Sequence, residues 1–407
     1  MADIDQKTHA IYDTRLEGLR GLCALIVMLA HFLLFNFFHS FKIPGFSFFA
    51  HLEFAHEAVL IFFVISGYVM GINHLNEKYN FANVVSYLKK RALRLYPIYL
   101  IALLISFTFD TNNGFSVTQL IGHLFFTQEF LVKTISSNTV LWSLSYEVVY
   151  YILFLGLWKS GKNVPKVCLV LSIAILIFIS IGPELTIVKS VLIGWLFWMM
   201  GLFSSQQEKK TVAAIRGKWG SLFSYFSIIL SIHFLGTGQL LIQALHFHGN
   251  YVFNVQIGDL LYLLPCFIII VTITGRSVKY LHVAKIISFA IPAFHIFLLV
   301  YFRHHLLSNI DWVYATLYFV LAVVCLPFNF ATSFFEKLNN VGRISYALYT
   351  FHFPVFYFLN IFLQKYLSGF WLLFTGLFCW AVITIFLSVG TERVLQPRIK
   401  KYFFAKA

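Results

Sequence analysis

The sequence predicts an all-α bundle of about 10–12 transmembrane helices, and three observations support this fold class. Of the 407 residues, 59% are hydrophobic and 11% are charged, against roughly 25% charged residues in an average soluble domain. Apolar stretches of about 20 residues, the length that crosses a bilayer, recur along the chain. The loops between these stretches alternate between many and few basic residues, as in polytopic membrane proteins.

Each apolar stretch is expected to form one membrane-spanning helix, because backbone N–H and C=O groups in lipid must pair within the segment. The stretch at 93–109 is short, and Gly236 and Gly238 interrupt the one at 220–244. The expected spans are 18–38, 56–74, 93–109, 141–158, 166–182, 186–204, 220–244, 258–275, 284–302, 312–330, 344–364 and 370–389.

The distribution of lysine and arginine predicts that both termini are cytoplasmic. With the first span running outward, 25 of the 30 Lys and Arg residues fall on the inner side, as the positive-inside rule requires. The start of the chain lacks the basic and apolar regions of a cleavable signal peptide. No linker-like segment divides the chain, so we expect one membrane domain over 1–407, with short polar tails at about 1–15 and 393–407. The five outer basic residues are Lys42, Lys133, Lys189, Arg303 and Lys365.

The net charge of +14 is explained by this topology, because the basic residues are scattered through short loops, so no nucleic-acid partner is expected. The five cysteines lie in apolar runs without CxxC or His–Cys spacing. This pattern argues against a disulfide framework and against a zinc site. We therefore expect no metal cofactor.

The first apolar stretch carries Arg20 and, eleven residues later, His31. On a helix these side chains share one face to within about 20° and lie about 16 Å apart along the axis. An ionisable residue within a span is a functional-site hypothesis by default. Arginine at the cytoplasmic mouth and histidine deeper in the membrane suit a ligand with an anionic head and a long reactive arm, such as coenzyme A. The alternative is an interface anchor and a structural histidine.

Two further clusters repeat this combination of basic and reactive groups. Arg91 and Arg94 lie three residues apart at the start of the third span, so both can face one phosphate; ordinary positive-inside anchoring is the alternative. Near the end of the chain, Arg343 precedes Ser345, Tyr349 and His352, which fall at i, i+4 and i+7 on one stripe of a helix. His352 would lie about 13 Å deeper than Arg343, which repeats the arrangement of the first helix.

A fourth cluster opens the span at 141–158 from the outer side. Ser143 and Glu147 lie one helical turn apart, next to Trp142. Hydroxyl, carboxylate and aromatic groups together are typical of a surface that binds sugar hydroxyls. An interfacial aromatic belt with a capped helix start is the alternative reading.

Taken together, these clusters resemble the motifs of the acyltransferase-3 family of membrane O-acyltransferases. Six elements follow one another in the order of that family and extend over most of the chain. They are Arg20 with His31, Phe62–Tyr68 as FFxxSG(F/Y), Arg91–Pro97 as RxxRxxP, Trp142–Glu147 as WSLxxE, Ser345–His352 as SYxLYxxH, and Glu392 with Pro397.

The resemblance implies transfer of an acyl group, acetyl by analogy, from cytoplasmic acyl-CoA to a hydroxyl of an extracytoplasmic carbohydrate, in a cell membrane such as the bacterial inner membrane. It implies that Arg20 and His31 are the essential pair and that the family usually has about ten helices. Combined with the clusters, we expect His31, Arg20 and His352 to be catalytic. The donor phosphates would be held by Arg15, Arg20, Arg91, Arg94 and Arg343, and the acceptor by Trp142, Ser143, Glu147 and Tyr349.

Three other functions fit the same residues. A transporter or flippase for a glycan intermediate would line its pathway with buried polar groups. An acyltransferase acting on a lipid would need the same donor site. A non-catalytic membrane scaffold would tolerate loss of both His31 and His352.

Overall fold

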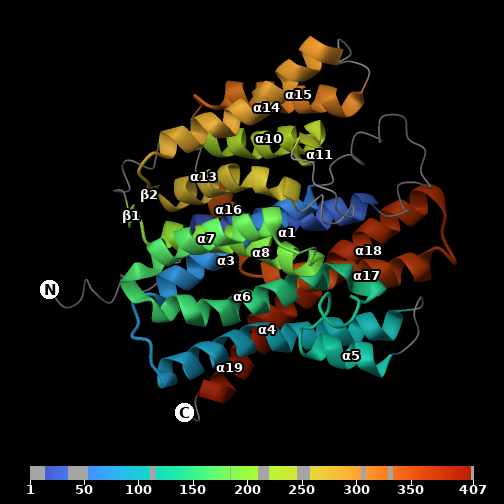
Figure 1. Cartoon of the computed structure of the whole chain (residues 1–407). Helices are drawn as coiled ribbons and strands as arrows, with labels where there is room; N and C mark the ends of the chain where they lie inside the picture. Colours follow the sequence, from blue (N-terminus) through green and yellow to red (C-terminus); the bar gives the residue numbers. More distant parts are fainter. Residues whose placement is uncertain are drawn as a thin grey trace. The chain divides into compact units, whose positions relative to one another are not determined.

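The computed structural model describes residues 14–34, 54–110, 116–183, 185–209, 220–244, 257–303, 309–328 and 333–404. Within these ranges the chain is a polytopic all-α bundle, as the sequence predicts (Figure 1). A single two-stranded antiparallel pair is present, in which Glu208 pairs with Ser277 and Lys209 with Arg276. The helices divide into two compact units, one containing 60–77 and 156–336 and the other containing 17–59, 78–155 and 337–407.

The first unit holds the middle of the chain. It includes most of α3 and the elements between α6 and α16. Their bounds are α3 Ala55–His74, η2 Gly161–Asn163, α7 Val164–Ile181, α8 Thr186–Ser205, β1 Glu208–Lys209, α10 Gly220–Leu235, α11 Thr237–Ala244, η3 Asp259–Tyr262, α13 Leu263–Thr274, β2 Arg276–Ser277, α14 Leu281–Arg303 and α15 Ile310–Cys325.

The second unit combines α1 from Glu17 onward and the C-terminal helices with α4 to α6. Its bounds are α1 Thr14–Leu34, α4 Phe81–Phe109, α5 Val117–Leu124, η1 Ser136–Leu141, α6 Trp142–Lys159, α16 Ser333–Gly342, α17 Ser345–Leu363, α18 Gly369–Val389, the π-helical turn η5 Gly390–Leu395, and α19 Gln396–Phe404. Helices α17 and α18 pack side by side in this unit (Figure 1).

Eight helices or helical runs in the described ranges are long and apolar enough to cross a membrane. Within the described ranges each expected span overlaps a helix, although 220–244 forms two helices, α10 and α11, because Gly236 between them adopts a φ of +62°. Positions 35–38 and 329–330 of the expected spans lie outside the described residues. The third span is longer than expected, since α4 runs for 29 residues. The chain also stays helical through η5 and α19, within the segment expected to be a polar tail. The eight are α3, α4, Ser136–Lys159, α7, α8, α14, α17 and Gly369–Phe403.

Small residues and one lysine explain how the first unit packs. A Cβ atom on Gly67 would lie 1.8 Å from the carbonyl oxygen of Trp198, and one on Gly201 would lie 1.9 Å from that of Val64. Helices α3 and α8 therefore cross with their backbones in contact, a crossing that membrane helices make through small residues. Lys189 donates to the carbonyls of Ile179 (2.9 Å) and Gly182 (3.1 Å) at the end of α7, where backbone acceptors lack helical donors.

Three buried tyrosines in the second unit each donate their hydroxyl to a backbone carbonyl. Tyr87 donates to Tyr151 (3.1 Å), Tyr99 to His123 (2.8 Å) and Tyr346 to Leu95 (3.1 Å). Because a buried phenol needs a partner for its O–H, these bonds fix the helices that carry both groups. They link α4 to α6, to α5 and to α17.

Helix α5 belongs to a segment that His123 ties together. Nδ1 of His123 lies 2.8 Å from the carbonyl oxygen of Gln119, and Nε2 lies 3.2 Å from the backbone nitrogen of Ile135. A carbonyl only accepts and an amide N–H only donates. The ring is therefore neutral, with its proton on Nδ1, and it joins α5 to the chain just before η1.

Candidate functional site

His31 and His352 meet in the second unit. His31 is near the end of α1 and His352 is in the second turn of α17. Nδ1 of His31 lies 3.1 Å from Nε2 of His352, and the two ring centroids are 5.2 Å apart. His352 is fully buried, whereas His31 is half-buried. The two helices thus join the histidines that the sequence predicted separately.

The hydrogen bonds of His352 determine which nitrogen of His31 carries a lone pair. Nδ1 of His352 lies 3.1 Å from the carbonyl oxygen of Leu348, which only accepts, so this nitrogen bears the proton. In the neutral ring, Nε2 of His352 is then an acceptor, and Nδ1 of His31 must donate to it. The lone pair of His31 is consequently on Nε2, where it can take a proton or attack a carbon.

A glycine contact near the start of α1 joins the helix of His31 to the end of α16, which leads into the helix of His352. A Cβ atom on Gly342 would lie 1.9 Å from the carbonyl oxygen of Glu17, and one on Gly21 would lie 2.8 Å from the backbone nitrogen of Gly342. No side chain larger than hydrogen fits at either position without moving backbone. The backbone of α1 therefore touches the end of α16 directly, ten residues before each histidine.

Aromatic side chains enclose the histidine pair. The ring of Phe353 meets that of His31 edge-on at 5.4 Å. Trp380 of α18 donates from Nε1 to the carbonyl oxygen of His352 at 2.7 Å and stacks on Phe32 of α1 at 5.1 Å. These contacts restrict the ring of His31 and the backbone of His352 to one arrangement, as pre-organised catalytic groups require.

Of the four residues expected to bind the acceptor, Ser143 and Tyr349 contact each other, with their hydroxyl oxygens 2.7 Å apart. Tyr349 also donates to the carbonyl of Val140 (3.1 Å), and its ring lies 5.9 Å from that of His352. The start of α6 is thereby placed against the helix that carries His352.

Trp142 and Glu147 lie in different surroundings from this hydroxyl pair. The ring of Trp142 stacks on that of His56 at 6.0 Å. Glu147 accepts a short hydrogen bond from the hydroxyl of Tyr151, one turn further along α6. The ring of Tyr151 in turn lies under the guanidinium of Arg91, 5.7 Å from its Cζ. Glu147 is thus linked through Tyr151 to one of the arginines expected to bind the donor.

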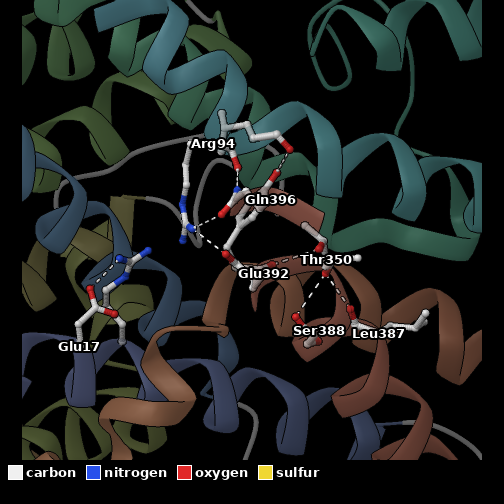
Figure 2. Close-up of polar contacts among 11 residues, drawn as sticks. Glu17, Arg94, Thr350, Leu387, Ser388, Glu392 and Gln396 are labelled. Carbon is white, nitrogen blue, oxygen red and sulfur yellow. Dashed lines mark hydrogen bonds and ion pairs between the residues drawn. The ribbon is translucent and has the colours of Figure 1, made fainter. Parts of the chain in front are cut away.

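Two of the arginines expected to bind phosphates are paired with buried carboxylates. Nη1 of Arg20 lies 3.2 Å from Oε1 of Glu17. Nη1 of Arg94 lies 2.7 Å from Oε2 of Glu392 and 3.1 Å from Oε1 of Gln396. Figure 2 shows the guanidinium of Arg94 pointing toward both side chains. Any phosphate bound by these arginines must therefore share them with a carboxylate of the protein.

The other predicted arginines have different partners. The guanidinium of Arg91 lies between the rings of Tyr87 (5.9 Å) and Tyr151 (5.7 Å). Among the described residues, its buried Nε has no hydrogen-bond partner. Arg343 is exposed at the end of α16. Arg15 belongs to the first unit, where its Nε lies 3.8 Å from Oε1 of Glu336.

Sequence reasoning did not include three residues of this region in the site. Glu392 and Gln396 hold Arg94, and Gln396 also donates to the carbonyl of Arg94 at 2.8 Å. Lys400, one turn beyond Gln396, is within electrostatic range of Arg91, Arg94 and Glu392. The spacing of Glu392, Gln396 and Lys400 at i, i+4 and i+8 is the sequence signal that would have identified this face.

Comparison with known proteins is consistent with the geometry. The chain matches the acyltransferase-3 family model, which describes an acyltransferase domain, over residues 13–390. No curated protein and no solved structure matches it. The match includes both histidines and nearly all of the helical bundle. The chain therefore belongs to the acyltransferase-3 family and is a multi-pass membrane acyltransferase.

Proposed function

We propose that the protein transfers an acyl group, most simply acetyl, from cytoplasmic acyl-CoA to a hydroxyl of a glycan on the far side of the membrane. The observation that carries this proposal is the hydrogen bond from His31 to His352, which leaves the lone pair of His31 on Nε2. His31 lies on the same helix as Arg20, α1, and the family to which the chain belongs is one of acyltransferases.

The donor would bind by its phosphates at the arginine-rich end of the second unit. Arg91 and Arg94 lie on one face of α4, and Lys400 adds a third positive charge near the carboxylate of Glu392. Arg20 and Arg343 lie beside the glycine contact of α1 and α16. Phosphate is a strong acceptor for arginine. The sequence also predicts Arg15 as a contact of the donor.

The reaction follows from the tautomer of His31. Nε2 takes the proton of the acceptor hydroxyl while the hydroxyl oxygen attacks the thioester carbon. The carbon–sulfur bond breaks, and the proton passes from His31 to the thiolate of the departing CoA. The products are an O-acyl ester and CoA with a free thiol. A two-step route, in which Nε2 of His31 first takes the acyl group, uses the same nitrogen. An acyl-enzyme trapped without acceptor would identify the second route.

The acceptor hydroxyl would approach from the side of Ser143 and Tyr349. Their paired hydroxyls and the ring of Trp142 supply the hydrogen-bonding and stacking groups that carbohydrate recognition uses. Glu147 would contribute through its bond to Tyr151. His352 acts on the reaction through His31, because its own ring is occupied at both nitrogens.

The test is transfer of radiolabelled acetyl from acetyl-CoA in proteoliposomes that contain the purified protein. His31→Ala should abolish transfer while CoA still binds, and Arg20→Ala should weaken CoA binding. His295→Ala is the matched control, since His295 is another buried histidine within a candidate span, hydrogen-bonded to Thr237 in the first unit. Wild-type transfer rates in a stable His31→Ala protein would refute the proposal.

The same assay separates the competing functions. A glycan transporter would move substrate without consuming the thioester. A lipid acyltransferase would label membrane lipid rather than a glycan acceptor. Mass spectrometry of envelope glycans with and without the protein would show whether acetyl groups disappear from the carbohydrate.

A further inference from the structure

Pro354 leaves a backbone acceptor unpaired in the helix that carries His352. It lies within α17, two residues after His352. Proline has no N–H, so the carbonyl of Thr350, four residues earlier, loses the donor that an α-helix would provide. This carbonyl is on the same turn as His352. In a buried helix such a group must find another partner or destabilise the fold.

The partner is Asn138, a residue of η1. Its Nδ2 lies 3.2 Å from the carbonyl oxygen of Thr350 and 3.0 Å from Oγ of Ser106 on α4. Asn138 is fully buried, and its backbone (φ −154°, ψ 67°) breaks the helical run of η1. Both contacts need a donor, because a carbonyl only accepts and Ser106 gives its own hydroxyl proton to Ala102 (2.7 Å). The amide orientation is thereby fixed, with one N–H for each acceptor.

Three side-chain donors thus hold one turn of α17. His352 donates to the carbonyl of Leu348, Asn138 to that of Thr350, and Trp380 to that of His352. The first sets the tautomer of His352, and the other two hold the backbone on either side of its ring. Asn138 is the only one of the three on the segment that leads into Trp142 and Ser143.

We propose that Asn138 is a positioning residue for the histidine pair: by replacing the N–H that Pro354 lacks, it holds the turn of α17 from which His352 directs His31. This proposal rests on the proposed function, because it assigns Asn138 a role in acyl transfer. Since Asn138 lies four residues before Trp142, the same hydrogen bond connects the proposed acceptor segment to the histidines.

The test is a double-mutant cycle between Asn138 and Pro354. Asn138→Ala leaves the carbonyl of Thr350 unpaired and should lower kcat about 10-fold to 100-fold, with little change in KM for acyl-CoA. Pro354→Ala supplies a backbone N–H to the same carbonyl. In that background Asn138→Ala should therefore have little further effect on kcat. Equal losses of kcat from Asn138→Ala in the two backgrounds would overturn the proposal.

Ser137→Ala is the matched control. Ser137 is the neighbouring residue, equally buried, and donates to the carbonyl of Ser106 at 2.8 Å, with no hydrogen bond to α17 among the described residues. It should leave kcat within about 2-fold of wild type, since only a neutral bond to α4 is lost. A loss as large as that of Asn138→Ala would show that the segment acts through α4 alone, and would overturn the proposal.

The structural half of the inference has a readout that does not depend on activity. The melting temperature in detergent should show the same coupling between Asn138 and Pro354 as kcat does. If the wild-type protein transfers no acyl group, the proposed function fails and the coupling in melting temperature still tests the hydrogen bond. If the melting temperatures are additive, the inference fails whatever the activity.

Discussion

Substitution of His352 distinguishes a histidine that orients His31 from one that moves protons itself. The ring receives a hydrogen bond on Nε2 from His31 and has no other task in the proposed reaction. A glutamine side chain places its Oε1 near the position of that nitrogen and can accept the same bond. Asparagine is too short to reach, and alanine offers no acceptor. The expected order of transfer rates is therefore wild type, then His352→Gln, then His352→Asn and His352→Ala together.

The magnitude follows from the burial of the pair. In His352→Ala the Nδ1–H of His31 loses its acceptor, and an unpaired buried donor costs about 1–3 kcal/mol. If that penalty falls on the transition state, kcat drops about 5-fold to 150-fold. His352→Gln restores an acceptor and should recover most of the loss. Loss of the preference for the His31 tautomer with its proton on Nδ1 would add to the effect of His352→Ala, because the lone pair would no longer be fixed on Nε2.

The assay is single-turnover transfer of labelled acetyl in proteoliposomes, with CoA binding measured on the same preparations. Binding should be unchanged in all three variants, because both ring nitrogens of His352 are occupied by Leu348 and His31 rather than available to the donor. A His352→Gln protein as inactive as His31→Ala would refute the orienting role and assign His352 a proton-transfer step. An active His352→Ala protein would refute the importance of the pair altogether.

Three further predictions concern other parts of the second unit. Gly342→Ala should lower the free energy of unfolding by about 1–3 kcal/mol through overpacking and reduce transfer, because the new Cβ has no room against α1. Gly156→Ala should be tolerated, since no atom lies within 4 Å of its new Cβ. Equal melting temperatures of the two variants would contradict this prediction. Glu392→Gln should tighten CoA binding, because it frees the charge of Arg94. The same change should lower the melting temperature. Weaker CoA binding by calorimetry would count against the arginine site. Burial lowers the pKa of His123, so the contribution of its neutral ring to stability is complete above the ordinary pKa of about 6.5. That contribution falls as the pH drops through this value toward the lower folded pKa. Hydrogen exchange over 117–135 should therefore increase in acid, and a pH-independent profile would contradict the neutral tautomer.

The helices and the two candidate histidines could be predicted because both depend on local sequence. Apolar runs fix where spans occur, and the break at Gly236 is visible as a glycine in an otherwise apolar stretch. The spacing of Arg20 and His31 depends only on helix geometry. Local pattern also placed His352 and Tyr349 on one stripe of α17, and these rings lie 5.9 Å apart.

The partners of the charged groups could not be predicted, because they come from distant parts of the chain. Arg94 and Glu392 are separated by 298 positions, and no local pattern indicates that a carboxylate from η5 would occupy an arginine expected to be available for phosphate. Asn138 was similarly visible in sequence only as the polar start of a span. Its role depends on a carbonyl that Pro354 leaves unpaired 212 positions away in Thr350.

The two histidines lie at equal sequence distances from the glycine contact between α1 and α16. Gly21 precedes His31 by ten residues and Gly342 precedes His352 by ten. Deleting one helical residue from either interval would rotate its histidine by about 100° and move it about 1.5 Å along the axis, so a change in one interval alone separates the rings. Side chains along the intervals can vary, but neither interval can gain or lose a helical residue without separating the rings.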